Sequence, residues 1–416
     1  MDLRQIKSRH EMTRFFDGYA TDRMEELGER KLKGGPLVKT SLLEVLSGEE
    51  ALTDERLLAI FGRRKVRLEP LDDTLFLVTD DDRGSIGFLE RVCPRIVALY
   101  SVLFADDFGP WSRRIVMRTP ELDHVWLSGL TFRVLWKLVA RSSHSHRFTQ
   151  LVFTHNSIFD IDGTTSESEE DDEEVSDACR DEDPTDVVDR RATSFTLVDR
   201  VGVIQEKLSS FQELYSPLYA ISRLRFPSSV GRGGHDFYDN GRVTNRSGSF
   251  RDHRSHVLFV VRIYEELLKS TEQRAWYSVG KHPGVGEQLC NIVGAPVVIR
   301  FEKPLENKVF DRWVSTTFER KRNRFRLWGH PIRLGPTKVH VYGVDRHLWQ
   351  PLFLELTAKG CTAIIPKGTC GNTVHRLVTN IQRYLSPGAE VFIGDKPYIE
   401  IVEEAARKIG YNVPSE

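Results

Sequence analysis

The sequence has no apolar run long enough to cross a membrane, because no window approaches the ~20 uninterrupted apolar residues that a spanning helix needs. The opening segment, residues 1–14, is charged throughout and lacks the apolar core of a secretory signal. Cysteine is also scarce: the five cysteines, at positions 93, 179, 290, 361 and 370, form no CxxC pair. These absences argue against a disulfide framework and a cysteine-based zinc site, and they predict a reduced, cytoplasmic protein without a membrane association.

Charge is present but unevenly distributed. Residues 162–189 contain fourteen acids against a single base, Arg180, whereas residues 190–416 contain 22 acids and 34 bases, a net charge of +12. The formal net charge of −1 therefore hides an acidic tract joined to a strongly basic C-terminal half. The tract has few apolar residues and cannot offset the entropy of ordering, so we expect a disordered linker. It is either a solvated spacer or a polyanion that competes with nucleic acid for the basic half.

This charge pattern and the hydrophobic periodicity predict three parts. Residues 1–161 are expected to form an α+β interaction domain with an antiparallel meander, since β-forming runs at 66–68, 75–78, 86–89, 96–100 and 115–117 alternate with turns. Residues 162–189 are the disordered acidic linker. Residues 190–416 are expected to form a basic α/β domain, because strands and helices alternate over the last 120 residues; it can divide further near residues 280–295.

Three segments give more specific expectations about secondary structure. Leu42, Leu43 and Val45 are assigned to an amphipathic helix, and a second helix follows Thr53 as its N-cap. The segment 228–256 is rich in glycine and arginine and is expected to be an irregular, flexible loop.

Basic residues interleave with aromatic ones in the C-terminal half. Guanidinium groups can bind phosphates while exposed rings stack on bases, a pairing typical of single-strand binding. The alternative is strand alternation, in which Phe325, Leu327 and Trp328 enter a core while the charged side chains face water. The predicted nucleic-acid-binding residues are Arg320, Lys321, Arg322, Arg324, Arg326, Trp328, Arg232 and Arg242. No zinc finger, KH, RRM or helix-turn-helix signature is present, so non-specific binding is expected.

Besides this basic and aromatic pattern, a second candidate site consists of two aspartates after an apolar run. Residues 158–164, Ile-Phe-Asp-Ile-Asp-Gly-Thr, resemble the first motif of the haloacid dehalogenase-like phosphohydrolases. The resemblance implies that Asp160 is the phosphoryl-accepting nucleophile and Asp162 a general acid/base, with Mg²⁺ between the carboxylates and the substrate. Asp395, after residues 391–394, resembles the late metal-binding motif, although the further acid, Glu400, falls one position later than the commonest spacing.

A third pattern is a glycine-containing loop between a strand and a helix, at residues 367–373. Free N–H groups at such a helix start can face an anion, and the predicted anion-binding residues are Lys367, Thr369, Gly371, Asn372 and Thr373. Cys370 at this position is expected to have a lowered pKa, with His340, His347 or His375 as its partner. The alternative is a tight turn with a helix cap.

These patterns favour an intracellular nucleic-acid-associated binding protein, a subunit of a larger assembly, that contacts phosphates through its basic half and needs no cofactor. The alternative is a Mg²⁺-dependent phosphohydrolase using Asp160 and Asp162. A third reading is an interaction protein whose positive half meets an acidic protein partner. Whether the chain is an enzyme stays open at this point.

Overall fold

The computed structural model describes residues 3–28, 36–46, 52–158, 193–281, 290–319 and 323–410. Asp160, Asp162, Arg320, Lys321, Arg322 and the acidic tract lie outside these ranges. The described helices are α1 (Arg9–Gly28), α2 (Asp54–Gly62), α3 (Ala105–Arg118), α4 (Gly129–Ser142), α5 (Val201–Leu214), α6 (Phe250–Ala275), α7 (Asn307–Val314), α8 (Asn372–Tyr384) and α9 (Tyr398–Lys408), with short helical turns at η1 (Leu3–Gln5), η4 (Ser216–Tyr219) and η5 (Ser315–Glu319). No helix among the described residues is long and apolar enough to span a membrane.

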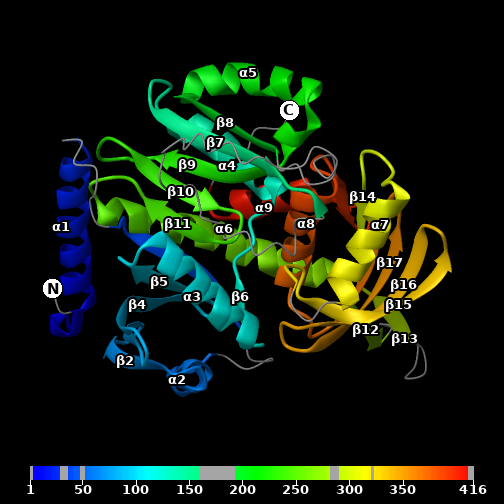
Figure 1. Ribbon diagram of the computed structural model, residues 1–416, viewed down its shortest axis with the longest axis horizontal. Helices are drawn as coiled ribbons and strands as arrows, with labels where there is room; N and C mark the ends of the chain where they lie inside the picture. Colours follow the sequence, from blue (N-terminus) through cyan, green and yellow to red (C-terminus); the bar gives the residue numbers. More distant parts are fainter. Residues whose placement is uncertain are drawn as a thin grey trace, which may run out of the picture.

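In the part of the chain that the structure describes, the larger sheet has eleven strands, all paired antiparallel, in the order β2-β3-β4-β5-β1-β11-β10-β9-β7-β8, with β6 beside β1. Its strands come from both sides of the acidic tract (Figure 1). They are β1 (Lys39–Val45), β2 (Val66–Asp72), β3 (Leu75–Asp80), β4 (Gly84–Cys93), β5 (Ile96–Ser101), β6 (Leu122–His124), β7 (Phe148–His155), β8 (Thr193–Arg200), β9 (Ile221–Pro227), β10 (Gly234–Tyr238) and β11 (Arg242–Asn245).

Among the described residues, the smaller sheet has nine strands in the order β15-β16-β17-β18-β14-β19-β20, with β12 beside β18 and β13 beside β12. Pairing is antiparallel except between β12 and β18. The strands are β12 (Trp276–Lys281), β13 (Cys290–Val293), β14 (Val297–Arg300), β15 (Leu327–Gly335), β16 (Lys338–Asp345), β17 (Gln350–Thr357), β18 (Gly360–Pro366), β19 (Glu390–Ile393) and β20 (Lys396–Pro397). The protein is therefore a mixed α+β fold, and the α/β layer expected for the C-terminal half is corrected, because hairpins rather than helical crossovers join most of these strands.

The predicted meander is confirmed as β2 to β5, and its apolar residues are buried on both faces. On β3, Leu75 and Leu77 join a core that reaches α6 and the smaller sheet, whereas Phe76 and Val78 join a second core beneath α2 and α3. Successive side chains of a strand point to opposite faces, so a continuous apolar run is what a doubly covered strand requires. The first core also contains residues from Leu3 to Ala406, and the two-domain arrangement is not confirmed.

Three local predictions are wrong. Residues 42–45 belong to strand β1, where burial on both faces produces an apolar run that periodicity alone does not distinguish from a helix. Residues 115–117 end helix α3, whose Phe108, Trp111 and Ile115 face the second core. Residues 228–256 contain β10, β11 and the start of α6, because their glycines occupy tight turns between strands. The N-cap Thr53 is confirmed, since its side chain accepts from Arg56 N–H.

Candidate functional site

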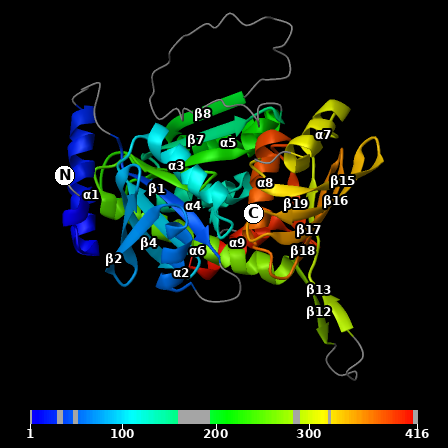
Figure 2. The same cartoon turned by 60° about the horizontal axis from the view of Figure 1, so that its bottom comes forward.

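The smaller sheet leaves one face of its outer strands uncovered, at one end of the molecule (Figure 2). On β16, Val339 and Val341 are buried, whereas Tyr342, the next residue along the strand, points to the opposite face and is 63% exposed. The same alternation on the neighbouring strands exposes other apolar side chains. We call this surface the aromatic sheet face, made of Trp328, Ile332, Tyr342, Phe353 and Ile364.

Cross-strand pairing brings these side chains together. Tyr342 lies opposite Phe353, and Phe353 lies opposite Ile364. The rings of Tyr342 and Phe353 meet edge to face, with centroids 5.3 Å apart and an interplanar angle of 88°. A shallow hollow of about 430 Å³ opens between them, and its polar edge is formed by Glu355, which pairs with Lys338 and His340 at 2.8 Å each. The face therefore offers flat rings beside titratable groups.

The predicted nucleic-acid-binding residues do not form one surface. Trp328 is 55% exposed on the aromatic sheet face, whereas Arg232 is exposed in the β9–β10 hairpin of the other sheet. Arg326 is buried, with Nη1 3.2 Å from Asp123 Oδ1, and Arg242 is buried with its guanidinium 3.8 Å from the centroid of the Tyr238 ring. Burial removes these two side chains from any contact with phosphates, which corrects their predicted role.

Arg324 is partly buried and donates to the Tyr384 hydroxyl. Arg320, Lys321 and Arg322 lie outside the described residues, directly before this segment in the sequence.

The predicted anion loop enters α8, and its donors bind groups of the protein itself. Gly371 N–H donates to Glu272 Oε1 at 2.9 Å, and Asn372 N–H donates to Cys370 Sγ at 3.3 Å. Thr373 donates to Asp345, Thr369 is buried, and Lys367 is exposed. The N–H donors expected at this helix start are thus present, but the Glu272 carboxylate of α6 accepts the bond from Gly371 in place of an external anion.

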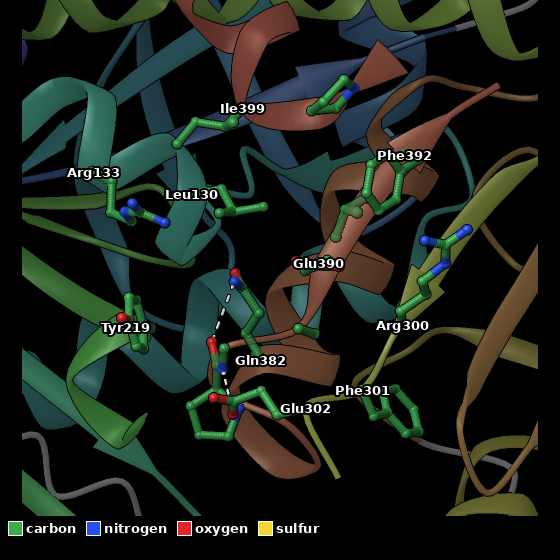
Figure 3. Close-up of a pocket in the computed structure, with 15 residues that line it drawn as sticks. Leu130, Arg133, Tyr219, Arg300, Phe301, Glu302, Gln382, Glu390, Phe392 and Ile399 are labelled. Carbon is green, nitrogen blue, oxygen red and sulfur yellow. Dashed lines mark hydrogen bonds between the residues drawn. The ribbon is translucent and has the colours of Figure 1, made fainter. Parts of the chain in front are cut away.

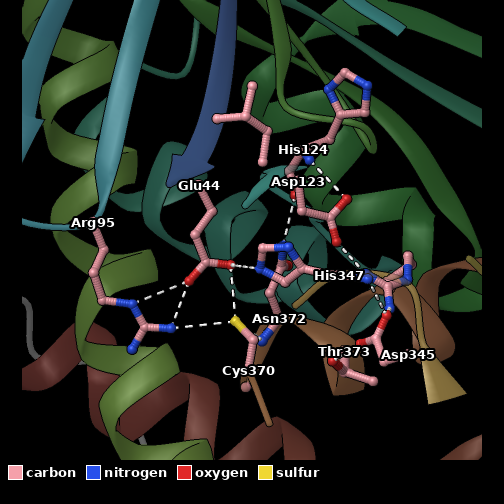
Figure 4. A network of polar contacts seen from close by, with 12 residues as sticks. Glu44, Arg95, Asp123, His124, Asp345, His347, Cys370, Asn372 and Thr373 are labelled. Atoms are coloured by element: carbon pink, nitrogen blue, oxygen red, sulfur yellow. Dashed lines mark hydrogen bonds and ion pairs between the residues drawn. The ribbon is translucent and has the colours of Figure 1, made fainter. Parts of the chain in front are cut away.

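Around this loop lies a buried network of polar side chains (Figure 4). Arg95, in the β4–β5 turn, donates from Nη2 to Glu44 at 2.6 Å, to Glu272 at 2.8 Å and to Cys370 Sγ at 3.2 Å. Burial and the neighbouring Glu44 carboxylate raise the pKa of Cys370 well above its ordinary value, so the lowered pKa expected from the helix N-terminus is wrong. Of the three histidines named as partners, His347 is the one beside the thiol.

The same network includes Asp123, which the sequence did not single out. Burial opposes its charge, but Arg376 and Arg326 hold its pKa well below the ordinary value. Arg376 bridges Asp123 and Asp345, with Nη2 2.6 Å from Asp345 Oδ1. Fully buried charges persist only when they are paired and hydrogen-bonded. In the sequence, the Asp-x-His spacing of Asp345 and His347 could have indicated this network.

A second polar cluster was also missed by sequence reasoning. Asp252 accepts from His235 Nε2 at 2.9 Å and from the Ser228 hydroxyl at 2.7 Å, and His256 follows it one turn later on α6. The i, i+4 spacing of Asp252 and His256 on a helix could have revealed the pair. The cluster borders an open cavity of about 450 Å³.

A cavity of about 660 Å³ lies between α4, α8, α9 and β14 (Figure 3). Arg133 stands over the Tyr219 ring and Arg300 over the Phe392 ring, at 5.5 and 4.9 Å from the centroids. Its volume suits a small molecule. Its lining mixes Arg133 and Arg300 with Glu302 and Glu390 and selects no charge class of ligand.

Asp395, the third acid of the phosphohydrolase resemblance, lies in the β19–β20 turn and belongs to neither polar cluster.

Comparison with known proteins gives a family but no activity. Residues 1–399 match the family described as MJECL33-like protein. The chain is 28% identical over 149 residues to "Uncharacterized protein MJECL33" of Methanocaldococcus jannaschii, a match that spans 36% of this chain and 34% of the relative's length. No solved structure matches the chain. Because the family match covers nearly the whole chain, this protein belongs to the MJECL33-like protein family.

Proposed function

We propose that this protein binds single-stranded nucleic acid and that bases stack on the aromatic sheet face. The observation that supports this proposal is the exposure of Tyr342 and Phe353 as cross-strand neighbours on an uncovered sheet. Aromatic rings on an open sheet are a recurrent platform for unpaired bases, because every base has a π-face whatever its sequence. Such binding discriminates little between sequences.

The charge of the C-terminal half supports the same proposal. Residues 190–416 have a net charge of +12, and the aromatic sheet face belongs entirely to this half. Lys338 lies on the same face of β16 as Tyr342, and its side chain is 47% exposed. Lysine and arginine near a stacking platform attract the phosphate backbone, and this attraction weakens with salt.

The β12–β13 hairpin supports a role as a subunit of a larger assembly. It projects from the body of the molecule (Figure 2) and exposes Val279 and Ile292, which lie opposite each other and are 72% and 70% exposed. A protruding apolar pair is costly in water unless a protein partner covers it. The proposed site of action of this assembly is the cytoplasm.

Fluorescence anisotropy with labelled single- and double-stranded DNA and RNA tests the proposal. Each base–aromatic stack contributes about 1–3 kcal/mol, so Tyr342→Ala and Phe353→Ala are each expected to weaken single-strand binding by about 5- to 150-fold. The matched control is Phe195→Ala on β8 of the other sheet, because Phe195 is 42% exposed and Phe353 39% exposed. Equal affinities of the Phe353→Ala and Phe195→Ala proteins would refute the stacking platform.

A further inference from the structure

Three potential metal ligands meet inside the molecule, and each comes from a different part of the chain (Figure 4). Glu44 lies on β1 of the larger sheet, His347 in the β16–β17 turn and Cys370 at the start of α8. All three side chains are fully buried. Glu44 Oε2 lies 3.0 Å from Cys370 Sγ and 3.8 Å from His347 Nε2.

The tautomer of His347 can be read from its surroundings. Nδ1 lies 2.7 Å from the carbonyl oxygen of Pro120, and a carbonyl only accepts, so Nδ1 carries a proton and donates it. In a neutral ring the other nitrogen, Nε2, then has a lone pair directed toward Glu44 and Cys370. Nε2 is buried and has no hydrogen-bond partner among the residues that the structure describes. A buried nitrogen without a partner is costly, and a metal ion at this position would satisfy it.

The outer contacts are those that hold metal ligands in position. The Nδ1–H···O=C bond orients the imidazole, as metal-binding histidines commonly require. Arg95 donates from Nε and Nη2 to Glu44 Oε1 at 3.1 and 2.6 Å, which leaves Oε2 directed at the cluster. Cys370 Sγ accepts N–H groups from Arg95 and Asn372, and such bonds stabilise a thiolate.

Size and charge both fit zinc. Zinc binds sulfur at about 2.3 Å and nitrogen or oxygen at about 2.0–2.2 Å, which places its ligand atoms about 3–4 Å apart. The network contains four carboxylates (Glu44, Glu272, Asp123, Asp345) and three guanidinium groups (Arg95, Arg326, Arg376), a net charge of −1. Zn²⁺ together with the Cys370 thiolate adds +1, so the network becomes neutral. A buried network with no net charge has the lower desolvation cost.

We infer that Glu44, His347 and Cys370 bind one Zn²⁺ ion through Oε2, Nε2 and Sγ. Binding replaces the thiol proton, now donated toward Glu44, and releases it to solvent, while a water completes the tetrahedral coordination. Because the ligands belong to both sheets, the ion would tie the larger sheet to the smaller one. This inference does not depend on the proposed nucleic-acid binding.

Metal analysis of the purified full-length protein is the first test. We expect about one equivalent of zinc per chain after gel filtration, and its loss from the Cys370→Ser and His347→Ala proteins. The matched control is Cys361→Ser, because Cys361 is buried on β18 but lies outside the cluster. Zinc that persists at the same stoichiometry in Cys370→Ser and His347→Ala would overturn the assignment.

Cobalt substitution of the unmodified protein keeps the test decisive if the variants do not fold. Co²⁺ bound through one thiolate in tetrahedral geometry is expected to give a sulfur-to-metal charge-transfer band in the near ultraviolet and intense visible bands, with about one proton released per ion. Zinc should abolish these bands by displacement. A folded, metal-free protein that gives no such spectrum with excess Co²⁺ and releases no proton would refute the site.

Discussion

Arg376 and Asp345 form an ion pair that is completely buried between the two sheets, with Nη2 2.6 Å from Oδ1. The second amino group of Arg376 reaches Asp123, so one guanidinium group pairs with carboxylates from β6 and from the end of β16. Burial lowers the pKa of Arg376, but the two carboxylates raise it by more. The pKa therefore lies above its ordinary value, and the side chain stays charged. The pair shows that the two sheets share a polar interior as well as an apolar core.

Replacing Arg376 by methionine should strongly destabilise the protein. The change leaves Asp123 and Asp345 buried with less compensation, and removing one partner of a buried pair costs about 3–5 kcal/mol. Arg333→Met is the control, because its partner Asp311 is 56% exposed and such pairs contribute about 1 kcal/mol or less. Urea denaturation of both proteins measures the difference in free energy of unfolding. Similar losses in the two proteins would contradict the buried pair's importance.

Stability should fall as the pH drops below about 6.5, partly because of His375. Burial lowers the pKa of this imidazole to about 3, and its Nδ1 lies 2.6 Å from the Tyr398 hydroxyl. Below about pH 6.5 the His375 imidazole binds a proton in the unfolded chain, whereas in the folded state it stays neutral down to about pH 3. Each such group removes about 1.4 kcal/mol per pH unit within this window.

The measurement is the free energy of unfolding at several pH values from 8 to about 5. His375→Gln should reduce the slope below pH 6.5 by about one proton relative to the parent protein. His124→Gln should act in the same direction, since burial lowers the pKa of His124 to about 4. Superimposable slopes for the parent and both variants would show that neither imidazole is kept neutral by folding.

Two glycines of the β9–β10 hairpin should respond differently to alanine. Gly233 has a φ of +82°, and a Cβ built on it would lie 1.9 Å from the carbonyl oxygen of Arg246. Gly233→Ala should therefore cost at least about 2 kcal/mol, from the left-handed conformation and the clash together. Gly231→Ala is the control, because no atom lies within 4 Å of the added Cβ. Equal thermal stabilities of the two proteins would indicate that the hairpin adapts freely.

The acidic tract should weaken nucleic-acid binding through its charge alone. Residues 163–188 hold most of the tract's net charge of −13, so their deletion is expected to lower the Kd several-fold at about 50 mM salt and less at about 200 mM. The control replaces the tract's acids by Asn and Gln and keeps its length. If only the deletion tightens binding, chain length rather than charge is responsible.

The meander could be predicted from the sequence, whereas only part of the aromatic sheet face could. Residues 66–101 are apolar runs separated by tight turns, and this local pattern was enough to predict the meander. Trp328 was also predicted as a binding residue from its sequence neighbours, and its side chain is 55% exposed. Tyr342 and Phe353 were not, because they become neighbours only through the pairing of β16 with β17.

Local pattern therefore determined the meander of β2 to β5, the N-cap of α2 and the uneven charge of this chain, since each depends on residues close together in sequence. Tertiary structure alone decided that β1 is a strand, that Arg326 is buried, and that Glu44, His347 and Cys370 meet. Glu44 and Cys370 are separated by 326 positions in the sequence. No periodicity encodes such a contact, because it arises from the packing of one sheet against another.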